Sequence, residues 1–143
     1  MPRRPLLIIL LAFAAATQAR ASECDRLNAY AAGVVVDYLD SWDNVYHFLG
    51  QFHSCYDASI AEGLNDSIYR LLADNWDSLP KMLKLAESDT AFRDFVYQRI
   101  EDEMFPQDLL SRVLHHAKYE CPAQANDFCQ AVIAGAAATM DAE

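Results

Sequence analysis

The residues best suited to charge chemistry lie in the first third of the chain. Asp37, Asp40 and Asp43 recur at every third position, and His47 follows four positions after the last of them. On one continuous helix these side chains would form an acidic ridge that ends in a titratable imidazole. Such a ridge could bind a basic partner, although a solvated helix face is the commoner meaning of a charge run. A helix break at Asp40 and Ser41 would divide the ridge.

A second acidic group is the run Glu101, Asp102 and Glu103, which follows a predicted helix. The carboxyl end of a helix carries partial negative charge, so each acid placed there is unfavourable by some tenths of a kcal/mol. A cation or a basic partner would explain the placement. The simpler explanation is that solvent screens these exposed charges, so that their position at the helix end costs little.

The segment 57–63 is the least ordinary local sequence. Ser59 and Glu62 have the spacing of a capping box, which predicts that a helix begins there. Gly63 then falls in the first helical turn, where glycine costs about 1 kcal/mol relative to alanine. Close approach by another helix explains this glycine better than close approach by a ligand. The candidate partner-binding residues of the chain are Asp37, Asp40, Asp43, His47, Glu62, Glu101, Asp102 and Glu103.

The common catalytic templates are missing from the sequence. It contains no Gly-x-Ser-x-Gly elbow, no His-Glu-x-x-His pair, no glycine-rich phosphate loop and no calcium loop of the usual spacing. We therefore predict no catalytic residue and no cofactor. A small hydrolase stays open as an alternative, because any two of the 21 acids could converge within the roughly 5 to 10 Å that glycoside chemistry uses.

The four histidines do not predict a metal site. His115 and His116 are adjacent, so on a helix they point about 100° apart and cannot bind one ion without other ligands. We expect both to lie at the surface. His47 and His53 are six positions apart, which is more typical of packing or capping residues than of a ligand pair.

The first 21 residues have the composition of a cleavable secretory signal. Arg3 and Arg4 precede an unbroken apolar run, Leu6–Ala16, and Ala19–Ala21 supplies the small residues at which a signal peptidase cleaves. The run is too short to cross a hydrocarbon core roughly 30 Å thick as a permanent helix. The paired arginines also fit twin-arginine export, but the strongly apolar run and the lack of a cofactor signature favour the general pathway.

Removal of this signal makes the net charge of the protein more negative. Three of the eleven basic residues and none of the 21 acidic ones lie in the signal, so cleavage changes the formal net charge from −10 to −13. Such a charge repels nucleic acid and anionic membranes and speeds the encounter with basic proteins. It also serves solubility alone. We expect a periplasmic or secreted protein with no nucleic-acid or membrane partner.

Export also gives the cysteines a meaning, because all four follow the signal and meet an oxidising compartment. We expect two disulfides, and of the three possible pairings we favour Cys24 with Cys55 and Cys121 with Cys129. On one continuous helix Cys129 would lie about 12 Å from Cys121, beyond the roughly 7 Å that a disulfide tolerates. The segment 122–125 must therefore fold back. The cysteine and histidine spacings do not favour a zinc site.

The apolar pattern predicts a single all-α domain over residues 22–143, a bundle of six or seven short helices. Within 25–52 the apolar residues fall at positions 27, 30, 31, 34, 35, 38, 39, 42, 45, 46, 49 and 52, the spacing of one core-facing stripe. This region is one helix or a hairpin that breaks before Trp42, with Ser41 as cap. Further helices are expected from Ser59 to about 74, over 79–87, from Ser88–Thr90 towards Pro106, after Pro106 and after Pro122.

Two stretches resemble a known group of proteins. Ser59–Gly63 and Leu71–Pro80, together with the ending from Cys121 to Cys129, look like small exported helical proteins of proteobacteria. The combination of signal peptide, acidic helical bundle and disulfides is also similar to periplasmic immunity proteins that block amidase toxins of type VI secretion. The resemblance implies a non-enzymatic inhibitor or immunity protein. No motif of the immunity families is carried onto a residue of this chain. The alternatives to an inhibitor or immunity protein are the small hydrolase and a structural envelope protein.

Overall fold

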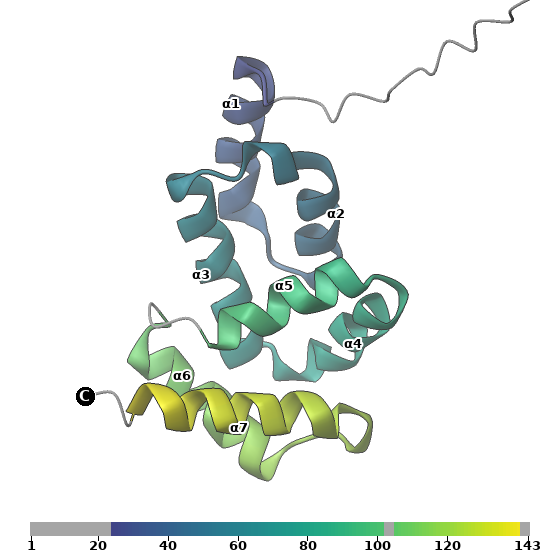
Figure 1. The fold of residues 1–143 in the computed structure, drawn as a ribbon, viewed down its shortest axis with the longest axis vertical. Helices are drawn as coiled ribbons and strands as arrows, with labels where there is room; N and C mark the ends of the chain where they lie inside the picture. The colour runs from purple at the N-terminus through teal and green to yellow at the C-terminus, as the bar shows by residue number, and fades with distance from the viewer. Residues whose placement is uncertain (1–23, 102–104, 141–143) are drawn as a thin grey trace, which may run out of the picture.

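The computed structural model describes residues 24–101 and 105–140. The predicted signal peptide, Asp102 and Glu103 lie outside the described residues. Within them the chain forms seven α-helices, four short 3₁₀ helices and no strand, which confirms the all-α fold class (Figure 1). The elements are α1 (Arg26–Val35), η1 (Val36–Tyr38), α2 (Trp42–Phe52), η2 (His53–Cys55), α3 (Ala58–Asp74), η3 (Trp76–Ser78), α4 (Leu79–Ser88), α5 (Thr90–Ile100), α6 (Gln107–Tyr119), η4 (Ala123–Ala125) and α7 (Asn126–Met140).

Short polar side chains set the starts of the helices. The Ser41 hydroxyl accepts a hydrogen bond from the N–H of Asn44, so the predicted break before Trp42 is confirmed. The Asp89 carboxylate accepts from two backbone N–H groups at the start of α5, as its position predicts. Each cap satisfies N–H groups that have no partner within the helix.

The predicted capping box at the start of α3 is wrong in its residues. Asp57, rather than Ser59, is the N-cap, and its carboxylate accepts from the N–H of Ile60 at 3.0 Å. The Ser59 hydroxyl donates to the same carboxylate at 2.9 Å. An aspartate just outside the helix out-competes the serine because it can accept both bonds at once. The helix therefore begins at Ala58.

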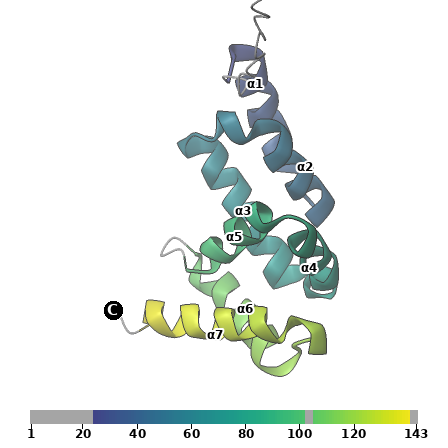
Figure 2. The same cartoon turned by 45° about the vertical axis from the view of Figure 1, so that its right-hand side comes forward.

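The helices follow one another along the long axis of the molecule. Figures 1 and 2 show α1 at the upper end, α2 and α3 below it, α4 and α5 in the middle, and α6 with α7 across the lower end. One contiguous apolar core runs through all of them. Its two indoles also satisfy their polar groups, since Trp42 Nε1 donates to Ser78 Oγ at 2.9 Å and Trp76 Nε1 donates to the carbonyl of Glu120 at 3.1 Å.

Both predicted disulfides are confirmed. Cys24 and Cys55 join the start of α1 to η2, with Cα atoms 4.9 Å apart. Cys121 and Cys129 have Cα atoms 6.2 Å apart, because η4 turns the chain back before α7 begins. The fold-back expected over 122–125 is therefore confirmed.

The predicted orientation of α1 is wrong. Its buried line is Ala32 and Val36, whereas five residues assigned to the core-facing stripe are exposed. The reason is close packing against α3: a Cβ added to Gly63 would lie 3.0 Å from Val36 Cγ1, so the helices approach where side chains are small. This contact also confirms the packing explanation of Gly63. The exposed residues are Leu27, Tyr30, Val34, Val35 and Tyr38, with 75%, 73%, 46%, 40% and 73% of their surface accessible.

Among the described helices, none is both long enough and apolar enough to span a bilayer.

Candidate partner-binding surfaces

The acidic ridge predicted from Asp37 to His47 is not continuous. Asp37 lies in η1 and Asp40 in the turn that follows, so the helix break divides the set. Asp43, in α2, forms an ion pair with Lys81 of α4 at 2.9 Å. His47 Nδ1 lies 2.7 Å from the backbone carbonyl of Asp43. The structure thus separates Asp37 and Asp40 from the other two.

Asp37 and Asp40 instead line a cavity of about 420 Å³ together with a third acid, Asp74. This cavity lies between the η1 turn and the carboxyl half of α3, which contributes Arg70 and Asp74, and Tyr38 forms part of its wall. We call this set of five residues the carboxylate cleft. Three carboxylates around one hollow can bind a cationic group such as a lysine ammonium or an arginine guanidinium.

The charges of the cleft are unequally compensated. Arg70 is paired with Asp66 at 2.7 Å, and Asp74 is paired with Arg112 of α6. Asp40 accepts a hydrogen bond from Asn44 Nδ2 at 2.8 Å but forms no ion pair with a described residue. For Asp37 the described part of the chain provides neither an ion pair nor a side-chain hydrogen bond. Two uncompensated carboxylates therefore face the hollow.

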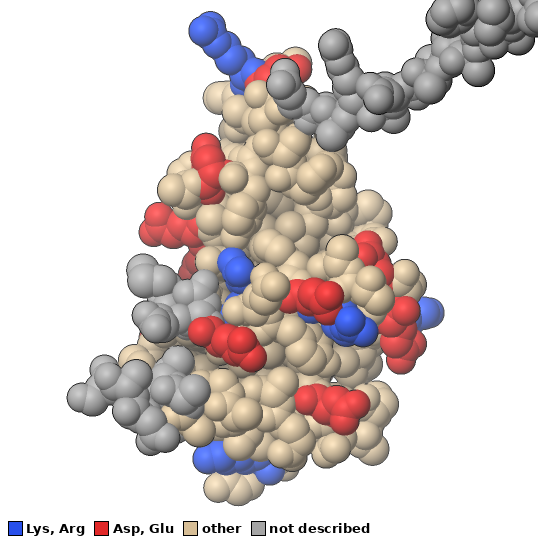
Figure 3. Space-filling view, in the orientation of Figure 1, with Lys and Arg blue, Asp and Glu red and all other residues tan. Residues whose placement is uncertain are grey.

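A second surface is the outer face of α1, formed by Leu27, Tyr30, Val34 and Tyr38. These residues are three or four positions apart and lie on the side of the helix opposite Ala32 and Val36. In Figure 3 the surface over α2 is mostly uncharged, a basic and an acidic side chain lie at the upper end, and further acidic side chains lie at the left over α3 and lower down over α4 and α5. Exposed apolar helix faces of this kind are typical of interaction sites.

Gly33 lies beside this outer face, and apart from its chain neighbours and the backbone of its own helix no described atom is within 4 Å of the position that a Cβ would occupy. A glycine inside a helix costs about 1 kcal/mol relative to alanine. Unlike Gly63, this glycine permits no close contact within the described chain. It therefore lowers the stability of α1 without a visible packing gain.

The remaining candidate acids are not brought to either surface. Glu62 is exposed in the first half of α3 and does not line the carboxylate cleft. Glu101 is the C-cap of α5, where its N–H donates to the carbonyl of Arg99. Asp102 and Glu103 lie outside the described residues.

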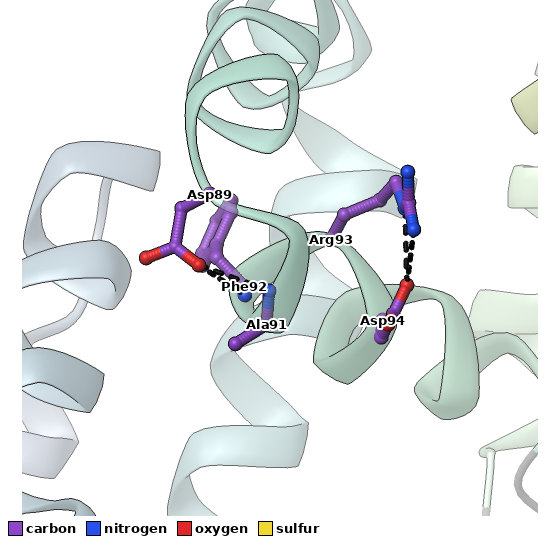
Figure 4. A network of polar contacts seen from close by, with 5 residues as sticks. All are labelled: Asp89, Ala91, Phe92, Arg93 and Asp94. Atoms are coloured by element: carbon purple, nitrogen blue, oxygen red, sulfur yellow. Dashed lines mark hydrogen bonds and ion pairs between the residues drawn. The ribbon is translucent and has the colours of Figure 1, made fainter.

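His47 and His53 both line a groove of about 640 Å³ between α2 and α5. The start of α5 closes this groove at Asp89, whose carboxylate is occupied by the cap bonds in Figure 4. Arg93 and Asp94 pair with each other at 2.8 Å on the next turn. No group of three or more His, Cys, Asp or Glu in the described segments could hold a metal ion.

The two adjacent histidines differ in their surroundings. His115 is exposed as predicted, but the expectation that His116 is a surface residue is wrong, since its side chain is only 23% accessible. The His116 ring stacks on Trp76 at 5.3 Å, with Nδ1 2.6 Å from Glu120 Oε2 and Nε2 3.2 Å from the carbonyl of Ala73. This imidazole therefore joins α6 to the end of α3.

Two titratable groups have shifted pKa values with structural causes. The N–H of Ile60 and the Ser59 hydroxyl, as donors to the Asp57 carboxylate, lower its pKa below the ordinary 3.8. Burial, with the nearby Asp127 carboxylate, raises the pKa of Tyr97 above the ordinary 10.0. The first shift belongs to a helix cap, and neither group lines the carboxylate cleft.

Sequence reasoning missed Tyr38 and Asp74 as members of the cleft and missed the outer face of α1. The signal for Asp74 was the four-residue spacing of Asp66, Arg70 and Asp74, which places them along one face of α3. For α1, the signal was that apolar residues occur on every side of the helix.

No family model, no curated protein and no solved structure matches the chain.

Proposed function

We propose that the chain is an exported, non-enzymatic protein-binding module whose carboxylate cleft holds a basic side chain of a partner protein. The observation that carries this proposal is that Asp37 and Asp40 face one hollow without an ion pair to any described residue. An inhibitor or immunity protein that blocks a secreted toxin is the form of such a module that the sequence resemblance favours.

The charge of the whole protein supports a basic partner. With the signal removed, the formal net charge is −13, as derived above from the full sequence. A field of this sign concentrates cationic proteins near the surface and speeds their association, and salt screens the effect. In the cleft the exposed carboxylates of Asp37, Asp40 and Asp74 then attract an ammonium or guanidinium group.

The disulfides suit this role and its compartment. Cys24 and Cys55 fix α1 to η2, and the η1 turn that carries Asp37 follows α1 directly. A binding site that is held in place before the partner arrives loses less conformational entropy on binding. Disulfides of this kind persist in the periplasm or outside the cell, which is where we place the protein.

Affinity capture from the periplasmic extract of the source cell tests the proposal. We expect the mature chain to retain one stoichiometric basic protein at low salt and to lose much of it at high salt. The double variant Asp37→Asn/Asp40→Asn should retain at least about tenfold less, as is typical when charged contacts are lost at an interface. The matched control is Asp77→Asn/Glu87→Gln, which removes two exposed charges outside the cleft.

The opposite results would contradict the proposal. Equal retention by both double variants would mean that the cleft does not bind the partner. Measurable cleavage of a glycan or peptide by the purified chain, with no stoichiometric partner, would favour the hydrolase alternative.

A further inference from the structure

The outer face of α1 lies opposite residues that are already buried, so apolar side chains cover two opposite sides of the helix. Ala32 and Val36 pack inward, while Leu27, Tyr30, Val34 and Tyr38 are exposed on the other side. A helix of this composition is typical of an element covered on both sides. We propose that a second copy of this chain covers the outer face, with the two α1 helices antiparallel about a two-fold axis near Gly33.

The charges along one flank of α1 indicate a second copy rather than an unrelated partner. Arg26 begins α1 and Asp37 lies in η1, which continues the helix with a tighter turn, so the two residues lie within about 60° of each other around the axis. Neither residue forms an ion pair within the described segments. The helix therefore carries one free positive and one free negative charge on the same flank, at opposite ends.

Antiparallel pairing brings these charges together. A two-fold axis perpendicular to the helices places each flank against the same flank of the other copy, with the helix directions reversed. Arg26 of each copy then meets Asp37 of the other, which forms two symmetric ion pairs. A parallel two-fold pair would place this flank on opposite sides of the two copies, so Arg26 and Asp37 would not meet, and only the antiparallel arrangement pairs them.

Gly33 lies between Arg26 and Asp37 along the chain, within about 20° of Arg26 around the axis and about 60° from Tyr30 of the outer face. Nothing lies within 4 Å of its absent Cβ in the described chain. A second helix backbone can approach closely at such a position. This supplies the packing role for Gly33 that the single chain does not show.

The area of the outer face of α1 indicates how strongly two copies would associate. Two tyrosines that are each 73% accessible, with Leu27 and Val34, offer on the order of 500 Å² per copy. The pair would bury about 1,000 Å², near the lower limit for a specific interface. We therefore expect a dimer that dissociates on dilution. Figures 1 and 2 both show α1 at the end of the molecule opposite α6 and α7, where a second copy can reach it.

This inference goes beyond the proposed function and does not depend on it. Asp37 borders both the carboxylate cleft and the α1 flank, whereas Asp40 belongs to the cleft alone. The variant Asp40→Asn therefore separates the two ideas, because it should weaken partner capture and leave self-association unchanged.

Sedimentation velocity of the disulfide-bonded mature chain tests the dimer, over about 1 µM to about 1 mM at physiological salt. We expect a reversible monomer–dimer equilibrium. Val34→Glu should abolish the dimer, and Arg26→Asp or Asp37→Arg should each raise the dissociation constant about tenfold, because two attractive pairs become two repulsive ones. The charge-swapped double variant Arg26→Asp/Asp37→Arg should restore it.

Circular dichroism of every variant serves as the control that the helices are retained. Substitution of Arg26, Val34 and Asp37 should leave the core intact, because all three are exposed. A wild-type chain that stays monomeric over the whole range would overturn the inference. So would single charge reversals that have no effect, a double variant that is not restored, or association that continues beyond the dimer.

Discussion

Gly63 of α3 lies so close to Val36 of η1 that a Cβ on the glycine would be 3.0 Å from Cγ1 and 3.1 Å from Cγ2 of the valine. The contact fixes the side of α1 that faces the core. It also fixes the position of the η1 turn, from which Asp37 and Tyr38 reach the carboxylate cleft. One missing side chain on α3 thus decides which residues of α1 are left exposed.

Replacement of Gly63 by leucine should therefore destabilise the protein. The larger side chain must displace Val36 or part the two helices, and over-packing of this kind typically costs about 1 to 3 kcal/mol. Urea denaturation followed by circular dichroism would measure the loss. The matched control is Gly50→Ala in α2, where nothing lies within 4 Å of the new Cβ and stability should rise by about 0.5 to 1 kcal/mol. Equal effects of the two substitutions would contradict this account of Gly63.

A second prediction concerns His116, which stacks on Trp76 and has an oxygen atom near each ring nitrogen. His116→Ala removes the stacking on Trp76, the contact with Glu120 at the end of α6 and the contact with the Ala73 carbonyl at the end of α3. We expect a loss of about 1 to 3 kcal/mol in the free energy of unfolding. His115→Ala alters an exposed ring on the same helix and should change stability by less than about 0.5 kcal/mol. Similar losses at both positions would show that the stacking contributes little.

Some of this structure could be predicted because it depends on neighbouring residues. Ser41 and Asp89 cap helices through N–H groups two or three positions away, so spacing alone identifies them. Export predicted two disulfides, and the pairing was favoured because Cys24 and Cys55 flank one helical region that could fold into a hairpin. At the start of α3, Asp57 and Ser59 were both suitable caps, and the choice between them depends on which can accept more bonds.

The orientation of α1 could not be predicted in the same way. Its apolar residues occupy every side, so hydrophobic spacing does not choose between Leu27 and Ala32 as core residues. The choice depends on Gly63, which is 31 positions away from Ala32 in sequence and belongs to another helix. The carboxylate cleft has the same origin, because Asp74 meets Asp37 and Asp40 only after α3 packs against η1.

The cap of α3 should give the protein a measurable acid sensitivity. The pKa of Asp57 is lower in the folded protein than its ordinary 3.8, because the charged carboxylate accepts bonds from Ile60 N–H and Ser59. Its contribution to stability is thus complete above pH 3.8 and is lost as the pH falls through the folded-state pKa. Asp57→Ala should be less stable than wild type at neutral pH, and the difference should shrink in acid.

Asp57→Asn is the control for this titration, because asparagine also caps helices but carries no charge. Unfolding by urea across a series of pH values gives the three free energies. A wild-type advantage over Asp57→Ala that stays constant to pH 2 would contradict the assignment of the cap to the ionised carboxylate.

The two disulfides should differ in what their removal does. In the chain-entropy model, the link over 31 positions between Cys24 and Cys55 stabilises the fold by about 3.5 kcal/mol, and the link over 8 positions between Cys121 and Cys129 by about 2.5 kcal/mol. Paired replacement by serine, with urea denaturation, would measure each. The first replacement frees the start of α1, so it should also weaken the proposed dimer, whereas the second should not. Intact mass should first show a gain of four hydrogens on full reduction of the wild-type protein, and a smaller gain would contradict the presence of both bridges in solution.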